Sequence, residues 1–294
     1  LEITYEDFFE VKTNERGPRK SWRDEMQPIE SIRATEPEEK VEEPRDLFGA
    51  EEQESEATET KLSTFEKQQR KMEETIKKFD LGYSLDEWQA FTDEALKQGY
   101  KLEFLEKTGL TIVKEEKRFD RFKGRVMFPI KSMSGRVLGF GGRILITDKK
   151  AAKYVNSPES IIYHKSNVLY GIYHAKQSIA KEDNCYLVEG YTDVIQFHQT
   201  GIKNVVSSSG TALTSEQIRL INRLTKNITV LFDGDAAGLR ASLRGIDLIL
   251  EQGMNVKVCT FPEGEDPDSF ARQNTLEELS DYLIENAKDF IQFK

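Results

Sequence analysis

Acidic residues gather at three places in the C-terminal half of the chain, and the first two places directly follow short apolar runs. The clusters are Val188-Glu189-Gly190-Tyr191-Thr192-Asp193, Leu231-Phe232-Asp233-Gly234-Asp235 and Asp266-Pro267-Asp268. Carboxylates held close together repel one another, and a bound cation is the usual compensation. These residue types therefore indicate a divalent-metal site that acts on phosphates.

Magnesium is the metal that this set of donors suits. It prefers oxygen ligands in near-octahedral geometry and keeps several waters, so a few carboxylates and substrate phosphates can hold it. Gly234 permits a tight bend that lets Asp233 and Asp235 approach one ion. Several carboxylates could hold two ions, an arrangement that clamps the attacking and leaving oxygens in phosphoryl transfer. The candidate ligands are Glu189, Asp193, Asp233, Asp235, Asp266 and Asp268. Manganese suits the same ligands, so Mg²⁺ and Mn²⁺ both stay open.

Each acidic cluster also has a plainer interpretation when it is taken alone. An Asp-Gly-Asp run is typical of a turn. A Glu-Gly-x-x-Asp run is typical of a strand-to-helix turn with an acid in the first helical turn. The ordered occurrence of the clusters after successive strands is not explained by turns, and it favours the metal site.

Strands and helices alternate after about residue 167, and this order must position the acidic clusters. The apolar patterns predict strands at 186–189, 205–207, 228–232 and 256–261, with helices at 192–199, 215–224 and 236–252. This order predicts a parallel sheet with helices on both faces. Ligands of such sheets bind outside the carboxyl ends of the strands. Glu189, Asp233 and the 266–268 acids are therefore expected at one edge.

The preceding region reads as a smaller mixed α+β part. Apolar spacing predicts helices at 62–79, from Ser84 to about 98, and at 102–108. Gly82 is the expected C-cap of the first helix, while Ser84 and Glu87 form the expected capping box of the second. From 111 to 146 the pattern changes to strands, with a hairpin of 126–130 and 137–140. Gly139, Gly141 and Gly142 are either close-packing positions or places where a ligand meets the backbone.

Charge is unevenly distributed along the 294 residues, whose net charge is −10. Residues 1–60 carry −11 and little apolar periodicity, so we expect a disordered acidic leader. Residues 114–176 carry +9, with bases interleaved with aromatic side chains, which indicates a surface for nucleic acid. A solvated charged face is the plainer alternative. The predicted domains are the leader at 1–60, a basic subdomain at 61–166 and a catalytic domain at 167–294.

Several classes of protein are excluded by composition. Cys185 and Cys259 each lie in an apolar run and are expected to be buried thiols of a reducing compartment. No histidine has metal-ligand spacing with a cysteine, so no zinc site is expected. No run of about 20 apolar residues and no signal peptide is present, which predicts a cytoplasmic protein without membrane partners. The first residue is Leu, so a fragment or processed form is expected.

Motifs upstream of the acidic clusters, and one between the first two clusters, occur in a specific order. They are RFKGRVMFPI at 121–130, GFGGR at 139–143, KYVNSPE at 153–159, YHK at 163–165, LYG at 169–171 and SGTALT at 209–214. Together with the acidic clusters, which resemble a Toprim domain, these motifs resemble the catalytic core of DnaG-type bacterial primases. The resemblance covers about residues 73–294.

This resemblance implies a DNA primase that makes short RNA primers on single-stranded DNA during replication. It implies metal-dependent nucleotidyl transfer from ribonucleoside triphosphates, an RNA–DNA hybrid product and a place in the nucleoid-associated replication machinery. Glu189, Asp233 and Asp235 would be the catalytic residues. Whether Glu189 binds metal or moves a proton stays open. The residues that would hold the nucleotide and the nucleic acid are Arg125, Arg143, Lys153, Asn156 and Lys165.

Some parts of the family pattern are missing from this sequence. No Cys/His cluster corresponds to the family's zinc-binding domain, and residues 1–72 do not resemble the segment that precedes the core. The resemblance implies that helicase binding would need the family's C-terminal domain, which we do not expect within this sequence. A Toprim-type nuclease or topoisomerase-like enzyme is the alternative, and a catalytically silent nucleic-acid-binding module is a third hypothesis.

Overall fold

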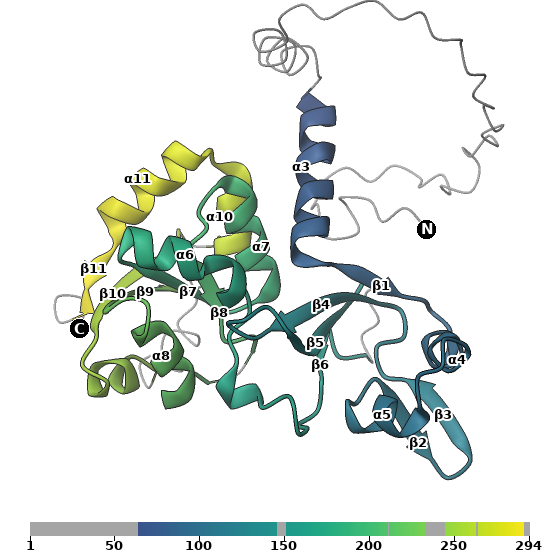
Figure 1. The fold of residues 1–294 in the computed structure, drawn as a ribbon. Coiled ribbons are helices and arrows are strands. Elements are labelled where there is room, and N and C mark those ends of the chain that lie inside the picture. Colours follow the sequence, from purple (N-terminus) through teal and green to yellow (C-terminus); the bar gives the residue numbers. More distant parts are fainter. Residues whose placement is uncertain (1–63, 146–150, 211, 233–244, 263, 291–294) are drawn as a thin grey trace, which may run out of the picture. The chain divides into compact units, whose positions relative to one another are not determined.

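The computed structural model describes residues 64–145, 151–210, 212–232, 245–262 and 264–290 (Figure 1). From Arg70 onward these residues belong to one compact unit. The predicted acidic leader at 1–60 lies outside the described residues. The domain boundaries after residues 60 and 166 stay predictions.

A five-stranded sheet forms the centre of the C-terminal half, in the order β11-β10-β9-β7-β8. Its strands are β7 (Cys185–Val188), β8 (Val205–Ser207), β9 (Asn227–Phe232), β10 (Asn255–Thr260) and β11 (Lys288–Asp289). The first four are parallel to one another, as their apolar runs predict. β11 is an antiparallel edge strand that the pattern did not predict, because its two residues are polar and exposed. The predicted α/β fold is confirmed.

Helices cover both faces of this sheet, with α7, α10 and α11 on one side and α8 on the other (Figure 1). The helical segments are α6 (Ile172–Glu182), α7 (Tyr191–Thr200), α8 (Ser215–Asn222), residues 245–251, α10 (Pro267–Gln273) and α11 (Leu276–Asn286). One hydrophobic core joins α6, α8 and residues 245–251 to the strands through side chains such as Ile179, Ile218, Val230 and Ile249. The helix predicted at 236–252 is confirmed over 245–251, and its remainder lies partly outside the described residues. Among the described helices, none is both long and apolar enough to cross a membrane.

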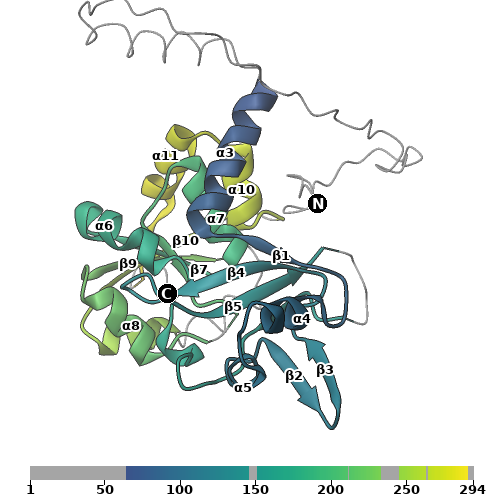
Figure 2. The same cartoon turned by 45° about the vertical axis from the view of Figure 1, so that its right-hand side comes forward.

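The smaller part contains a four-stranded sheet in the order β1-β4-β5-β6 and a two-stranded ribbon, both seen in Figure 2. The strands are β1 (Gly82–Ser84), β2 (Thr111–Lys114), β3 (Lys117–Asp120), β4 (Arg125–Lys131), β5 (Val137–Ile144) and β6 (Tyr154–Asn156). The helices are α3 (Thr64–Phe79), α4 (Ala90–Lys97) and α5 (Leu102–Lys107), and a short 3₁₀ turn η2 (Lys165–Asn167) precedes α6. The predicted hairpin is confirmed as β4 and β5, which turn at Gly135 with a φ of +90°.

The predicted Gly82 C-cap is wrong. Helix α3 ends at Phe79, and Asp80 adopts the left-handed conformation with a φ of +52°. The backbone N–H of Leu81 then donates to the carbonyl of Ile76 at 2.9 Å. Gly82 lies in β1, opposite Met127 of β4, so pairing with a distant strand determines its backbone.

The predicted capping box of Ser84 and Glu87 is also wrong. Ser84 pairs with Arg125 at the end of β1, and α4 begins only at Ala90. The cap comes from Asp120 on β3, whose carboxylate accepts the backbone N–H groups of Phe91 at 2.7 Å and Thr92 at 3.0 Å. A carboxylate can satisfy the first N–H groups of a helix from any part of the chain that reaches them.

The three glycines of β5 are close-packing positions. A Cβ added at Gly139 would lie 2.8 Å from the ring of Tyr163, and one at Gly142 would lie 2.6 Å from Phe122. At Gly141 it would lie 2.5 Å from the ring of Tyr191. Side chains of the protein therefore occupy the space that a ligand would need to reach this strand.

Two histidines make the docking of α3 sensitive to acid. The rings of His174 and His198 lie 4.5 Å and 5.1 Å from the buried ring of Phe79. Burial lowers the pKa of His174 to about 4 and that of His198 to about 3. Their charged neighbours are Lys78, Asp80, Lys131, Lys176 and Lys203.

We expect this histidine pair to destabilise the protein as the pH falls. Both pKa values are depressed on folding, so their contribution is fully present above about pH 6.5 and is lost below it. Between pH 7 and pH 5 the pair should remove about 2 kcal/mol of unfolding free energy, after a discount for partial exposure. Urea unfolding at both pH values measures this loss. The double variant His174→Gln/His198→Gln should flatten it, whereas the exposed control His164→Gln should keep it. An equal loss in the double variant would contradict the assignment.

Candidate active site

The first acidic cluster begins at the carboxyl end of a parallel strand, and the third lies at the start of α10. Glu189 directly follows β7, and its side chain is exposed. β9 pairs with β7 on one side and β10 on the other, so the ends of all three strands share one edge of the sheet. Asp233 and Asp235 come directly after β9 but lie outside the described residues. For Glu189, the predicted position at this edge is confirmed.

Asp193 lies one helical turn beyond Glu189 and is largely buried. Its carboxylate accepts the backbone N–H of Gly190 at 2.7 Å, which closes the first turn of α7. This bond fixes the turn that carries Glu189. Asp193 therefore has the capping role that is typical of an acid in the first helical turn. A role of Asp193 as a metal ligand stays a prediction.

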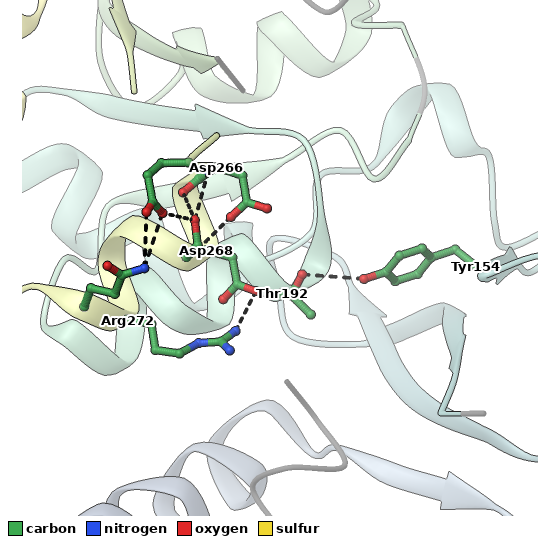
Figure 3. A network of polar contacts seen from close by, with 8 residues as sticks. Tyr154, Thr192, Asp266, Asp268 and Arg272 are labelled. Carbon is green, nitrogen blue, oxygen red and sulfur yellow. Dashed lines mark hydrogen bonds and ion pairs between the residues drawn. The ribbon is translucent and has the colours of Figure 1, made fainter. Parts of the chain in front are cut away.

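Asp266 and Asp268 differ in what they contact (Figure 3). Asp266 is the N-cap of α10, and its Oδ1 accepts the backbone N–H of Ser269 at 2.6 Å. Asp268 forms an ion pair with Arg272, with 2.9 Å between Nη2 and Oδ2. Burial raises the pKa of Asp268, and the Arg272 guanidinium opposes that shift.

One oxygen of Asp268 is suited to a cation. Oδ1 is buried and has no hydrogen-bond partner within the described part of the chain. A buried carboxylate oxygen without a partner is costly, and a bound cation would satisfy it. Within the described residues no group of three or more His, Cys, Asp or Glu side chains is placed to hold a metal. The oxygen donors that are described nevertheless fit a hard cation such as Mg²⁺.

Basic and aromatic side chains of the four-stranded sheet face this acidic edge. The Arg143 guanidinium carbon lies 5.9 Å from the centre of the Tyr154 ring, and Arg143 lowers the pKa of Asp268 electrostatically. The Tyr154 hydroxyl lies 3.5 Å from the Thr192 hydroxyl on α7 (Figure 3). The structure therefore brings Arg143 close to the predicted metal ligands.

The other predicted nucleotide-binding residues are placed differently. Arg125 is buried, and its guanidinium donates to the carbonyls of Ala152 at 2.9 Å and Lys153 at 3.2 Å. These bonds hold the segment that leads into β6. Lys153 has an exposed side chain, whereas Lys165 is half-buried in η2. Arg125 thus holds the backbone at Ala152 and Lys153 in place. A direct contact of Arg125 with a nucleotide stays a prediction.

Asn156 lies at the junction of the two sheets. Its amide nitrogen donates to the carbonyl of Ser209 at 3.3 Å, and its amide oxygen accepts the hydroxyl of Tyr191 at 2.7 Å. Sequence reasoning did not single out Tyr191, Tyr154 or Arg272. Of these three residues, Tyr191 alone had a signal in the sequence, because it lies two residues after the predicted catalytic residue Glu189.

A cavity of about 370 Å³ opens beside Glu189 at the same edge of the sheet. Its wall is mostly apolar, with Leu187, Leu213 and Ile246 among the lining residues, and Ser208 contributes a polar group. Cys185 and Cys259 are buried free thiols, as predicted, and burial raises the pKa of Cys259 to about 11. Neither cysteine is therefore a nucleophile of this site.

Comparison with known proteins agrees with this architecture. The family described as "DNA primase catalytic core, N-terminal domain" matches residues 50–176, and the family described as "Toprim-like" matches residues 186–271. The expectation that residues 1–72 do not resemble the family is therefore wrong for residues 50–72. A crystal structure of a DNA primase domain from Pseudomonas aeruginosa is 38% identical, with a TM-score of 0.68, and the match covers 75% of this chain and 70% of that one. The chain belongs to the DnaG primase family.

Other members of the DnaG family extend this comparison. The RNA polymerase domain of Mycobacterium tuberculosis primase DnaG is 33% identical with a TM-score of 0.69, over 83% of this chain and 78% of that one. The DNA primase of Clostridium acetobutylicum is 42% identical over 76% of this chain. The chain spans about 37% of the length of that relative and of the Halalkalibacterium halodurans DNA primase, which is 40% identical over 75% of this chain.

Proposed function

We propose that this chain is the catalytic core of a DNA primase, which makes short RNA primers on single-stranded DNA during replication in the bacterial cytoplasm. The observation that carries the proposal is the approach of Arg143, on the four-stranded sheet, to Asp268, on the helix α10 that follows β10. Phosphates need cations beside them, and a metal-binding edge next to a basic face supplies both. One solved relative is described as a DnaG primase catalytic domain bound to ssDNA, which supports a DNA template for this chain.

The proposed reaction is nucleotidyl transfer. The 3′-hydroxyl of a growing primer attacks the α-phosphate of an incoming ribonucleoside triphosphate. A new bond forms between the 3′-oxygen and the α-phosphorus. The bond between the α-phosphorus and the oxygen that bridges to the β-phosphate breaks, and pyrophosphate leaves. Arg143 and Lys153 would neutralise triphosphate and template charge, and Asn156 would orient the nucleotide through a hydrogen bond.

The acids Glu189, Asp193, Asp233, Asp235, Asp266 and Asp268 would hold Mg²⁺ or Mn²⁺. Such an ion supplies Lewis-acid stabilisation of the charge that develops on the phosphate oxygens. Of these acids, Glu189, Asp233 and Asp235 would be essential. Asp193 would also keep the Glu189 turn closed through its bond to Gly190. Arg272 would keep Asp268 ionised and direct its free oxygen toward the site.

Incorporation of labelled ribonucleotides on single-stranded DNA tests this proposal. We expect template-dependent RNA that is abolished by EDTA and restored by excess Mg²⁺ or Mn²⁺. The variant Asp233→Asn should lose at least about 100-fold in rate, because loss of metal-site groups has effects of that order or larger. The control Asp247→Asn removes an exposed acid from the 245–251 helix and should keep full activity. Cleavage of the template strand without RNA would overturn the proposal in favour of a Toprim-type nuclease.

A further inference from the structure

Tyr191 joins the turn that carries Glu189 to the four-stranded sheet. It begins α7 directly after Glu189-Gly190, and only 2% of its surface is exposed. Its ring stacks on Phe128 of β4 with 5.2 Å between ring centres and 19° between planes. The ring also faces Gly141 of β5, where a Cβ would be 2.5 Å away. These contacts with Phe128 and Gly141 hold the Tyr191 ring in a single orientation.

The hydroxyl of Tyr191 is what orients Asn156. It donates to Oδ1 of Asn156 at 2.7 Å, and the Ser209 side chain is a second hydrogen-bond partner. Asn156 in turn donates from Nδ2 to the carbonyl of Ser209 at 3.3 Å. A side-chain amide has an oxygen that accepts hydrogen bonds and a nitrogen that donates them. A hydrogen-bond donor held at the oxygen therefore determines the direction in which the nitrogen points. The donor nitrogen of Asn156 is thereby held on the side of Ser209.

Ser209 links Asn156 to the end of β8. Its backbone has a φ of +58°, which is uncommon for a residue other than glycine. Its hydroxyl lies 3.1 Å from the hydroxyl of Ser207, at the end of β8. The chain of contacts Tyr191–Asn156–Ser209 therefore connects the Glu189 turn, β6 and the loop that follows β8.

Tyr170 provides a comparison within the same core. It too is 2% exposed, and its ring packs edge-on against Tyr191 with 4.8 Å between centres. Its hydroxyl, however, is buried and has no hydrogen-bond partner in the part of the chain that the structure describes. Two tyrosines of equal burial thus differ in whether their hydroxyl has a bonded partner. A purely packing role for Tyr191 would require only its ring.

We propose that Tyr191 is a positioning residue that orients the Asn156 amide for the incoming nucleotide and couples it to the Glu189 turn. This inference rests on the proposed primase function. Loss of the hydroxyl should leave the ring in place and release the amide of Asn156. Nucleotide binding should then weaken, whereas the acidic edge should still support the chemical step once the nucleotide is bound.

The test compares Tyr191→Phe with Tyr170→Phe in the full chain, by primer synthesis at varied nucleotide concentration. For Tyr191→Phe we expect KM for the nucleotide to rise about tenfold, the size of effect that one hydrogen bond has, with kcat changed by less than about threefold. Tyr170→Phe should change neither constant. Adding Tyr191→Phe to Asn156→Ala should cause no further rise in KM, because both changes remove the same contact.

Two outcomes would overturn the positioning role. One is a Tyr191→Phe variant with a lower melting temperature but an unchanged KM, which would reduce Tyr191 to packing. The other is an additive effect of the two substitutions. If the unmodified chain makes no template-dependent RNA, the proposed function fails and this inference fails with it. An active chain with an insensitive KM rejects the positioning role alone.

Discussion

Replacement of Glu189 by glutamine should lower the rate of template-dependent RNA synthesis by at least about 100-fold. Glutamine keeps the shape of the side chain but removes the charge, and a neutral amide is a poor ligand for a hard cation. The side chain is exposed at the end of β7, so we expect a change in unfolding free energy of less than about 0.5 kcal/mol. Rates from labelled ribonucleotide incorporation, together with thermal melting curves, measure both effects.

Glu182 offers a matched control for this experiment. It is an exposed glutamate at the end of α6, and its ion pair with Lys181 is a surface contact. Glu182→Gln should therefore keep both rate and stability. Wild-type activity in Glu189→Gln would exclude a carboxylate role for this residue. Glu189→Asp keeps the charge on a shorter side chain, so partial activity in that variant would indicate that the charge at this position matters.

Substitution of Gly141 by alanine should strongly destabilise the protein. The new Cβ would lie 2.5 Å from the ring of Tyr191, and that ring is itself held between Phe128 and Tyr170. The backbone of Gly141 cannot move aside easily, because β5 is paired with β4 on one side and β6 on the other. Overpacking of a buried site costs about 1 to 3 kcal/mol. In a unit of this size the melting temperature should fall by about 2 to 12 °C.

Gly82 is the control for the alanine substitution. A Cβ at this position has no atom within 4 Å, and Gly82 also lies in a strand of the same sheet. Gly82→Ala should therefore change the unfolding free energy by less than about 0.5 kcal/mol. Equal melting temperatures for Gly141→Ala and the unmodified chain would mean that the contact between β5 and Tyr191 is not tight in solution.

Much of the C-terminal architecture follows from local pattern. The side chains of a continuous apolar run such as 228–232 are buried on both sides of the strand only when helices cover both faces of the sheet. Alternation of strands with helices indicates that the sheet is parallel. The parallel pairing then places Glu189, which follows β7, at the edge of the sheet where β9 and β10 also end. The same reasoning could not detect β11, because two exposed polar residues contain no periodic signal.

Other features depended on partners far away in the chain. The expected cap at Ser84 was wrong because pairing with β4 takes that segment into a strand, and Asp120 replaces the local cap. The role of Arg125 differs from the expected one because its guanidinium meets carbonyls 27 and 28 residues away. Local sequence holds no information on which distant group reaches a helix end or a guanidinium.

The sequence by itself determined the parallel α/β architecture, the position of Glu189 at the end of a parallel strand and membership of the DnaG family, because these depend on residue type, order and spacing. Only the tertiary structure decided how Gly141, Tyr191 and Asn156 fit together, and that Asp268 pairs with Arg272 while keeping one oxygen without a partner. The physical reason is that close packing and hydrogen-bond orientation act over a few ångströms between segments that lie far apart in sequence. Such contacts exist only after the two sheets have brought those segments together.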